Sequence, residues 1–344
     1  MIDWRSSMDR YYELVEVDPE GMTEGRMVGT LAGGASVSYY SGGLGYEVSA
    51  VVYEQLDPSL YYRLYMVCQQ GAETERVALA TFVPQLPKRT MSAASERREV
   101  RGYSPLIELD SDYPPLGWTA SGDAVASAVD IVRNHCRAPV SRPSKSAGMA
   151  PWTASDNDTW LDCLVEILAA AGMHVEVTGS GTVTFADNPT GNESPVFVFD
   201  DAAYDLPSII MPEVTDNTSY YDSSNTVEVI YSKDGAAFFS RQQDAGRVKR
   251  DGYVRTKRDT SPKITAPPTQ AKVEAYAKAL LADELSIENE ANFTHAYVPT
   301  VRPNRCVELD YTRHGYRVCG QMGDQTLQCT PAALVSSVIK YTGE

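Results

Sequence analysis

The sequence lacks a long apolar run, since no segment reaches the roughly 18 consecutive apolar residues of a membrane-spanning helix. We also expect no N-terminal signal peptide, because residues 1–18 contain no apolar core followed by small residues. We therefore expect a chain that stays in the cytoplasm, or that leaves it by a route independent of signal peptides. Hydrophobic residues make up 43% and charged residues 22%, which disfavours wholesale disorder.

Cysteine is scarce and scattered, with six residues among 344 and no C-x-x-C pair. That spacing excludes a disulfide framework, so we expect reduced and mostly buried thiols. The six are Cys68, Cys136, Cys163, Cys306, Cys319 and Cys329.

Positive charge is also in deficit, because 30 Lys and Arg residues face 46 Asp and Glu residues and the formal charge is −16. Tight binding of nucleic acid depends on clustered Lys and Arg, so this balance argues against a protein that grips DNA. The same charge balance is compatible with a surface that DNA passes without binding. At roughly 100–200 residues per domain, the length predicts two or three domains.

The two ends of the chain have strand patterns. In the first segment, polar residues alternate with Tyr46, Val48, Ala50 and Val52, and further aromatic and β-branched runs cover 60–67, 77–83 and 100–109. The glycine-rich tract 33–43 is either a long hairpin loop or a weakly specified strand pair. In the last segment, strand patterns recur around 227–231, 307–311 and 337–341.

The middle of the chain has helical spacing. Residues 125–132 place valine and alanine at i, i+3, i+4 and i+7, and a second helix follows with Asp158 as its expected N-cap and Gly172 after its end. A hairpin over 175–185 follows, with its turn at Gly179-Ser180-Gly181. The apolar stripe expected on the second helix is Leu161, Leu164, Val165 and Leu168.

The predicted fold class is therefore α+β, mostly β. We expect a first β-barrel domain at 1–112, an α+β insert domain at 113–195 and a second β-barrel domain at 196–344. A helix near 269–286, introduced by Pro267-Pro268-Thr269, interrupts the second barrel. Its expected apolar stripe is Val273, Tyr276, Ala277, Leu280 and Leu281.

The search for catalytic motifs gives negatives, and we expect neither an enzyme nor a cofactor. Gly102-Tyr103-Ser104 is similar to a nucleophile elbow but lacks its final glycine, so Ser104 is better explained as a strand or turn serine. No phosphate-binding glycine motif is present. The histidines and cysteines lack the close pairs of a structural zinc site, and we expect packing or surface roles for them. The residues considered are His135 beside Cys136, His174, His295, His314, Cys306, Cys319 and Cys329.

Acidic clusters give equally little chemistry. The segments Asp156-Asn157-Asp158 and Asp187-Asn188 begin like calcium loops but lack the later glycine and glutamate, so turns and helix caps are expected there. Glu108 with Asp110, and Glu308 with Asp310, place two carboxylates on one face of a predicted strand. Glycosidases use such pairs, but a solvated acidic strand is the simpler interpretation.

One basic cluster stands out from this acidic chain. Six positive residues fall within 247–258, and a looser run covers Lys88, Arg89, Arg97, Arg98 and Arg101. A mobile solvated loop is one interpretation of the cluster, an electrostatic contact with an acidic neighbouring subunit is the functional one, and DNA contact is a third. The cluster consists of Arg247, Lys249, Arg250, Arg255, Lys257 and Arg258.

The order of these segments resembles the central tail-hub or baseplate-hub family of tailed phages and contractile injection systems. This family includes the N-terminal hub region of tail-associated lysins and late control protein D. The resemblance consists of six weak sequence patterns that follow one another in the same order as in that family, and it covers roughly residues 20–344. They are YYRLY at 61–65, LATFVP at 79–84, VRGYSPLIEL at 100–109, the helix and hairpin at 158–185, PSIIMPEV at 207–214 with NTVEV at 225–229, and the closing helix with AYVP at 296–299 and RCVEL at 305–309.

The resemblance implies a structural virion component, located in the tail and assembled in the host cytoplasm. It implies a homotrimer in which two barrels per chain present a pseudo-sixfold face to a hexameric tail tube or distal-tail ring, with a spike, fibre or tail-tip protein on the other face. Passing DNA is not gripped, no membrane is entered by this chain, and most of the acidic excess is expected to face the channel.

Two other functions stay open from the sequence. A receptor- or glycan-binding tail module requires exposed aromatic clusters, for which Tyr39-Tyr40, Tyr61-Tyr62 and Tyr220-Tyr221 are candidates. Burial of one tyrosine per pair favours core packing instead. A cell-wall hydrolase rests only on the carboxylate pairs described above.

Overall fold

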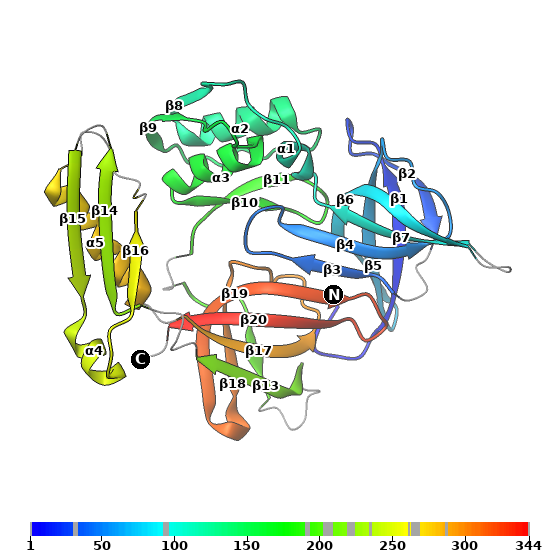
Figure 1. Ribbon diagram of the computed structural model, residues 1–344. Helices are drawn as coiled ribbons and strands as arrows, with labels where there is room; N and C mark the ends of the chain where they lie inside the picture. Colours follow the sequence, from blue (N-terminus) through cyan, green and yellow to red (C-terminus); the bar gives the residue numbers. More distant parts are fainter. Residues whose placement is uncertain are drawn as a thin grey trace. The chain divides into compact units, whose positions relative to one another are not determined.

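A computed structural model gives the structure of the chain, and it describes two compact units. Unit 1 comprises Met1–Val214 and Asn292–Ile339, and unit 2 comprises Thr215–Ala291 and Lys340–Glu344 (Figure 1). The residues described are 2–29, 34–91, 96–189, 193–201, 209–218, 224–233, 236–260, 262, 269–285 and 288–342. The expectations for Gly33, Tyr220, Tyr221, Pro267 and Pro268 lie outside these ranges.

Strands predominate, with helices in the middle of the chain and in unit 2, so the predicted α+β, mostly β class is confirmed. The N-terminal strands are all antiparallel to their neighbours. They are β1 (Asp9–Val17), β2 (Glu24–Gly29), β3 (Ser36–Tyr39), β4 (Tyr46–Val52), β5 (Tyr61–Gln70), β6 (Glu73–Met91) and β7 (Glu96–Tyr103). The strands predicted around 46–52, 60–67 and 77–83 are therefore present.

Strand β6 is long enough to belong to two runs of strands. Its first part, up to Phe82, pairs with β5, and its second part, from Val83, pairs with β7. The two runs are β2-β1-β5-β6 and β6-β7-β4-β3, and the second continues into β19 (Tyr316–Gln328). Buried side chains of both runs meet in one core, where Leu64 and Met66 of β5 join Val48 of β4.

The C-terminal segment adds to this core. Strand β19 (Tyr316–Gln328) pairs with β18 (Cys306–Tyr311) along its first half and with β3 along its last four residues, and Leu327 and Val335 are buried in the core. The strand order there is β13-β17-β20-β19. The remaining elements are β12 (Val198–Asp200), parallel to β18, β13 (Ile210–Thr218), β17 (Glu288–Ala296), the 3-10 helix η1 (Thr312–His314) and β20 (Leu334–Thr342).

The middle of the chain forms a second core around three helices. Its elements are α1 (Ile107–Asp110), β8 (Thr119–Asp123), α2 (Ala124–His135), β9 (Gly148–Thr153), α3 (Trp160–Ala170), β10 (Met173–Val177) and β11 (Val183–Asp187). The predicted stripe of α2 is buried, and the predicted hairpin is the β10–β11 pair. Gly172 follows α3 with φ +67°, a conformation that favours glycine over other residues.

Three local predictions in this region are wrong. The strand expected over 100–109 ends at Tyr103, and Glu108 and Asp110 lie on α1 instead. The N-cap of α3 is Thr159, because its side chain accepts a hydrogen bond from the Asp162 N–H while the Asp162 carboxylate accepts one from Thr159 N–H, which is a capping box. Asp158 instead accepts from the Ser155 N–H.

The buried stripe of α3 also differs from the predicted one. Leu161, Leu164 and Leu168 are buried as expected, but Val165 is 39% exposed and Ile167 is buried instead. Trp160 and Cys163 complete the buried side of this short helix.

The tip of the β10–β11 hairpin packs tightly against strand β6. A Cβ atom placed on Gly179 would lie 2.0 Å from the carbonyl oxygen of Ala78, so a side chain at this position overlaps the backbone of β6. The Thr81 hydroxyl donates a hydrogen bond to the Gly179 carbonyl at 2.8 Å, and Arg63 Nη2 donates one to the Ser180 carbonyl at 2.7 Å. The hairpin is thereby fixed to the first core.

Unit 2 contains a small three-stranded sheet and a helix that packs on it. Strands β14 (Thr226–Lys233), β15 (Ala236–Gln243) and β16 (Thr256–Asp259) form a sheet, with α4 (Ala245–Asp251) between β15 and β16. Helix α5 (Gln270–Leu285) packs on one face of this sheet (Figure 1). All five residues of its predicted stripe face the core that contains Val227 and Val229. Thr269 accepts a hydrogen bond from the Lys272 N–H, so it caps the helix as predicted.

The described helices include none that is long and apolar enough to cross a lipid bilayer.

We predict that Gly179→Ala lowers the free energy of unfolding of unit 1 by about 1–3 kcal/mol, because the added methyl group forces the hairpin away from β6. Urea denaturation followed by tryptophan fluorescence measures this, since all four tryptophans lie in unit 1. The matched control is Gly42→Ala, where nothing lies within 4 Å of the added Cβ. Equal stability of the two variants contradicts the packing described here.

Candidate functional site

The basic cluster predicted from the sequence lies on α4, on β16 and between them. Asp244 caps α4 by accepting a hydrogen bond from the Arg247 N–H at 2.8 Å, and Gly252 ends the helix with φ +80°. The interpretation as a mobile solvated loop is therefore wrong, because a helix and a strand that pairs with β14 place these residues.

Asp251 is the centre of the first half of the cluster. Its carboxylate forms ion pairs with Arg255 and Arg250 and lies 3.9 Å from Arg247 Nε. Desolvation opposes ionisation of Asp251, but hydrogen bonds from Asn225 and Arg250 and the charge of Arg255 outweigh it and lower its pKa. Arg247 is only 7% exposed and the Arg255 side chain only 14%, so these two charges are largely part of the internal structure of unit 2.

The second half of the cluster pairs with carboxylates of β14 and α5. Lys257 Nζ lies 2.6 Å from Glu284 Oε1, and Arg258 Nη2 lies 2.8 Å from Glu228 Oε2. Lys249 is exposed, and within the described part of the chain no ion pair involves it. The side chains of Arg250, Lys257 and Arg258 are 58%, 47% and 62% exposed, so a positive surface remains.

The histidines occupy separate environments. His135 stacks on Trp160 with ring centroids 3.9 Å apart, His174 contacts Glu176 and Asn188, and His314 lies against Tyr311. Among the residues that the structure describes, no group of three or more His, Cys, Asp or Glu side chains is placed to hold a metal ion.

His295 is buried, and its ring packs against those of Phe199 and Phe293, which also contact each other. Its Nδ1 lies 2.7 Å from the Ala296 carbonyl, which identifies Nδ1 as the donor in the neutral ring, and its Nε2 lies 2.8 Å from Ser337 Oγ. Burial lowers the pKa of His295 to about 4, although the carbonyl of Ala296 partly opposes this shift.

Five of the six cysteines are buried, and Cys319 is exposed. The Sγ atoms of Cys306 and Cys319 lie 3.5 Å apart across the β18–β19 pair. Cys136 instead donates to the Pro105 carbonyl at 3.4 Å, and its neighbour His135 faces Trp160.

The residues considered as candidates for hydrolysis form hydrogen bonds or ion pairs with other residues of the chain. Ser104 is buried, and its hydroxyl donates to the Leu44 carbonyl. Glu108 accepts hydrogen bonds from Tyr61 and from Arg137, and Glu308 pairs with Arg317 at 2.7 Å.

The remaining acidic candidates have similar roles. Asp187 pairs with Lys145, and Asp310 accepts a hydrogen bond from the Thr312 hydroxyl at 2.8 Å. The N–H of Asn188 donates to the Gly172 carbonyl at 2.9 Å, at the end of the β10–β11 hairpin.

The tyrosine pairs supply no aromatic platform within the described residues. Tyr61 and Tyr62 are both fully buried, while Tyr39 is 4% and Tyr40 is 37% exposed. This alternation in the second pair places one ring in the core and one at the surface, as expected for a strand and its following loop.

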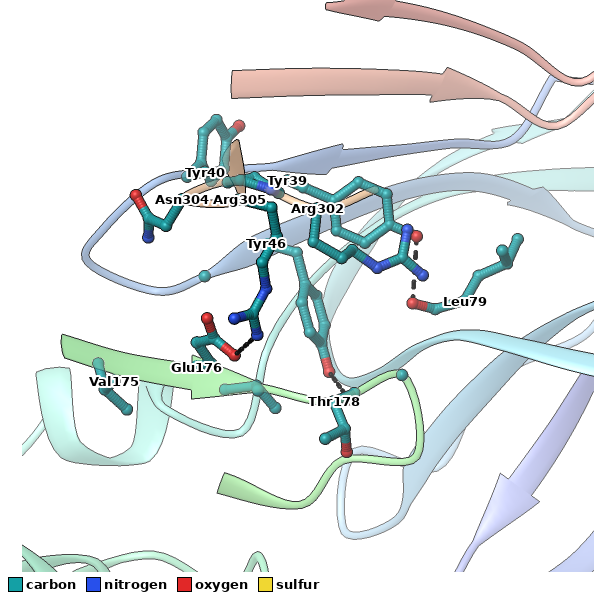
Figure 2. Close-up of a pocket in the computed structure, with 14 residues that line it drawn as sticks. Tyr39, Tyr40, Tyr46, Leu79, Val175, Glu176, Thr178, Arg302, Asn304 and Arg305 are labelled. Carbon is teal, nitrogen blue, oxygen red and sulfur yellow. Dashed lines mark hydrogen bonds and ion pairs between the residues drawn. The ribbon is translucent and has the colours of Figure 1, made fainter. Parts of the chain in front are cut away.

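Unit 1 contains a cavity of about 280 Å³ that the sequence did not indicate. The β10 strand, the loop between β3 and β4, and the turn after β17 line it (Figure 2). Arg305 Nη2 pairs with Glu176 Oε2 at 2.9 Å, and Arg302 lies against the ring of Tyr39. The one available signal was the pair of arginines three residues apart at 302–305, but nothing in the sequence places that turn beside β10.

Comparison with solved structures finds the same fold along the whole chain. The tail protein from Neisseria meningitidis MC58 is 14% identical with a TM-score of 0.69, over 96% of each chain. The 43 kDa tail protein of prophage MuSo2 from Shewanella oneidensis is 9% identical with a TM-score of 0.64, over 96% of this chain and 98% of that one.

A third structure, prophage tail protein gp18 from Listeria monocytogenes EGD-e, is 11% identical with a TM-score of 0.55, over 95% of this chain and 94% of that one. No family model and no curated protein sequence matches the chain. The chain therefore shares its fold with phage and prophage tail proteins, as the resemblance in the sequence implies.

We predict that Asp251→Ala destabilises unit 2, because the like charges of Arg247, Arg250 and Arg255 lose the carboxylate that balances them. Hydrogen exchange of the β14 and β16 amides measures the effect, with β5 amides of unit 1 as an internal reference. Lys249→Ala, on the exposed side of α4, is the control and changes exchange little. The described role of Asp251 is wrong if both variants exchange at the same rate.

We predict that His295 makes unit 1 lose stability as pH falls from about 6.5 to about 4. The unfolded chain binds a proton on this histidine near pH 6.5, whereas the folded chain keeps it neutral until about pH 4, so acid favours unfolding in that window. Urea titrations between pH 6.5 and 5 are expected to show a smaller slope of unfolding free energy with pH for His295→Gln, by up to about 1.4 kcal/mol per pH unit. Identical slopes contradict a buried neutral histidine.

Proposed function

We propose that the chain is a structural component of a phage-type tail, the central hub of the tail or baseplate. The observation that supports this most is the match in fold to tail proteins over 96% of this chain and at least 96% of two of those chains. Because the match covers nearly the whole of both chains, it favours a shared role over the presence of a single common domain in otherwise different proteins. Fold alone does not determine function, so the role itself needs a direct test.

We infer that three copies form a ring with six β-rich lobes. The proposed lobes are 1–112 and 196–344 of each chain, with the insert 113–195 between them. Strand-rich segments at both ends of the chain, separated by helices, support this division, and the β3–β19 pairing with its shared core joins the two proposed lobes into one body. Such a trimer contacts a hexameric tail tube or distal-tail ring on one face and a spike, fibre or tail-tip protein on the other. Closed contacts of this kind allow sixfold and threefold partners to join.

The charge of the chain fits the passage of DNA. With a formal charge of −16, a ring of three copies has a large acidic excess. We infer that much of this excess faces the channel, because carboxylates repel phosphates and leave the genome free to move. A basic lining of the channel in the assembled ring contradicts this part of the proposal.

The basic cluster of unit 2 is proposed as a contact with an acidic neighbouring subunit. Arg250, Lys257 and Arg258 keep much of their side chains exposed although each has a carboxylate partner. Because every other copy of the chain is strongly acidic, these residues favour protein contact over DNA contact.

The two alternatives have less support. Among the described tyrosine pairs, burial of Tyr39, Tyr61 and Tyr62 removes the platform that a glycan-binding module needs. The ion pairs of Glu108 and Glu308 occupy the carboxylates proposed for a hydrolase. An assay of cell-wall clearing by the wild-type chain distinguishes the hydrolase, and clearing that Glu108→Gln or Glu308→Gln abolishes favours it.

Electron microscopy of tail particles tests the hub directly. An affinity tag inserted at the exposed β5–β6 turn, between Gly71 and Ala72, marks the chain without touching either core. We expect three tags per particle, at the end of the tube and related by a threefold axis, with six peripheral lobes. Labels distributed along the tube, six labels at one level, or particles without the label contradict the proposal.

A further inference from the structure

The cavity of unit 1 lies beside a turn that the surrounding strands hold in place. The turn follows β17, and Asn304 adopts a left-handed backbone conformation there with φ +65°. The Asn304 N–H donates to the Met322 carbonyl at 2.8 Å, and its side chain donates to the Ser41 carbonyl at 2.9 Å. The side chains of Arg302 and Arg305 are therefore presented to the cavity from a fixed backbone.

Arg302 has an unusual set of neighbours for a cation. Its Nη2 donates to the Tyr297 hydroxyl at 2.8 Å, and its guanidinium lies 4.5 Å from the centre of the Tyr39 ring and 5.4 Å from that of Tyr297. Both rings are almost fully buried. Aromatic faces attract a guanidinium but provide no opposite full charge.

The charge of Arg302 is not balanced by a carboxylate within the described part of the chain. The ion pairs there, formed within 4.0 Å, do not include this residue. A guanidinium has five N–H donors, and one hydrogen bond of Arg302 is present. Arg302 has no nitrogen that is buried and lacks a hydrogen-bond partner. Its remaining N–H donors are therefore open to solvent, on the side where Arg302 lines the cavity.

The rest of the lining sets the charge that the cavity accepts. Arg305 is already paired with Glu176, so the two arginines and one glutamate leave a single positive charge. A second negative charge on a ligand would meet the Glu176 carboxylate, which disfavours a phosphate dianion. The volume of about 280 Å³ suits one small organic group, and Thr178, Asn304 and Tyr40 also line it (Figure 2).

We propose that this cavity is a binding site for a single carboxylate group of glutamate size, held by the guanidinium of Arg302. A planar guanidinium with free N–H donors matches the two oxygens of a carboxylate. The carboxylate comes either from a free small acid or from an acidic side chain of a peptide. The inference depends on unit 1 alone, so it does not depend on the tail-hub proposal.

Arginine-selective chemical modification tests the site in the wild-type chain. Phenylglyoxal modifies accessible guanidinium groups, and mass spectrometry of the digested protein reports the modified fraction at each arginine. We expect N-acetylglutamate amide to protect Arg302 at least tenfold in rate, in a saturable way, while the surface residue Arg317 is modified at an unchanged rate. Arg317 is the matched reference, because its side chain is 67% exposed and pairs with Glu308 on β18.

The choice of probes separates the possible outcomes. Protection by acetate as well as N-acetylglutamate amide supports a site for free small acids, and protection by the latter alone supports an acidic side chain. Equal protection by N-acetylglutamine amide, which lacks the charge, overturns the proposal. Protection by inorganic phosphate without protection by the glutamate probe also overturns it, as does the absence of any protection.

Calorimetry of two variants gives an independent measurement. Binding of N-acetylglutamate amide is expected to weaken at least tenfold in Arg302→Gln and to be unchanged in Arg317→Gln. Arg302→Lys, which keeps the charge but loses the planar donor pair, is expected to weaken binding less. Tryptophan fluorescence checks that each variant is folded, and equal affinity of folded Arg302→Gln and wild type contradicts the site.

Discussion

The attachment of the β10–β11 hairpin to strand β6 is the constraint on which unit 1 depends. Arg63 is 6% exposed, and its guanidinium donates to Thr81, Glu24, Tyr65 and the Ser180 carbonyl. A buried guanidinium is stable only when its donors are satisfied, so the hairpin tip completes the environment that Arg63 requires. Gly179 makes this approach possible by leaving the space that a side chain would occupy. The helical insert and the first core are thus fixed to each other by backbone contact.

Long strands that change partners join the remaining parts of unit 1. Strand β6 leaves β5 for β7 after Phe82, and β19 leaves β18 for β3 near its end. Because each of these strands takes part in two pairings, the runs of strands are joined into one sheet. The C-terminal residues Leu327 and Val335 then close a core begun by the N-terminal strands, so the chain ends bury a common surface. This arrangement places the turn of Arg302 beside β10, although 125 residues separate Arg302 from Val177 in the sequence.

Local patterns predicted the elements well, while contacts distant in sequence were beyond them. Helix α2, the stripe of α5 and the hairpin turn at 179–181 follow from spacing and from glycine, since these signals act within a few residues. The choice of Thr159 over Asp158 as a cap depended on Asp162 one turn later, a capping box that was present in the sequence but not used. The cavity was not predictable in this way, because its lining joins residues from four distant segments.

The positive residues of this acidic chain act mainly within the fold. Arg63 and Arg247 are buried, Arg137 connects two separate segments through Glu108, and Arg255 pairs with Asp251 four residues before it. Cations used in this way are not free for phosphate, and the surplus of carboxylates is left for the surface. Arg302 departs from this rule, since its neighbours in the described structure are aromatic rings and a hydroxyl. In a chain that otherwise gives its buried guanidinium groups anionic or carbonyl partners, this difference is the reason to expect an external carboxylate at that position.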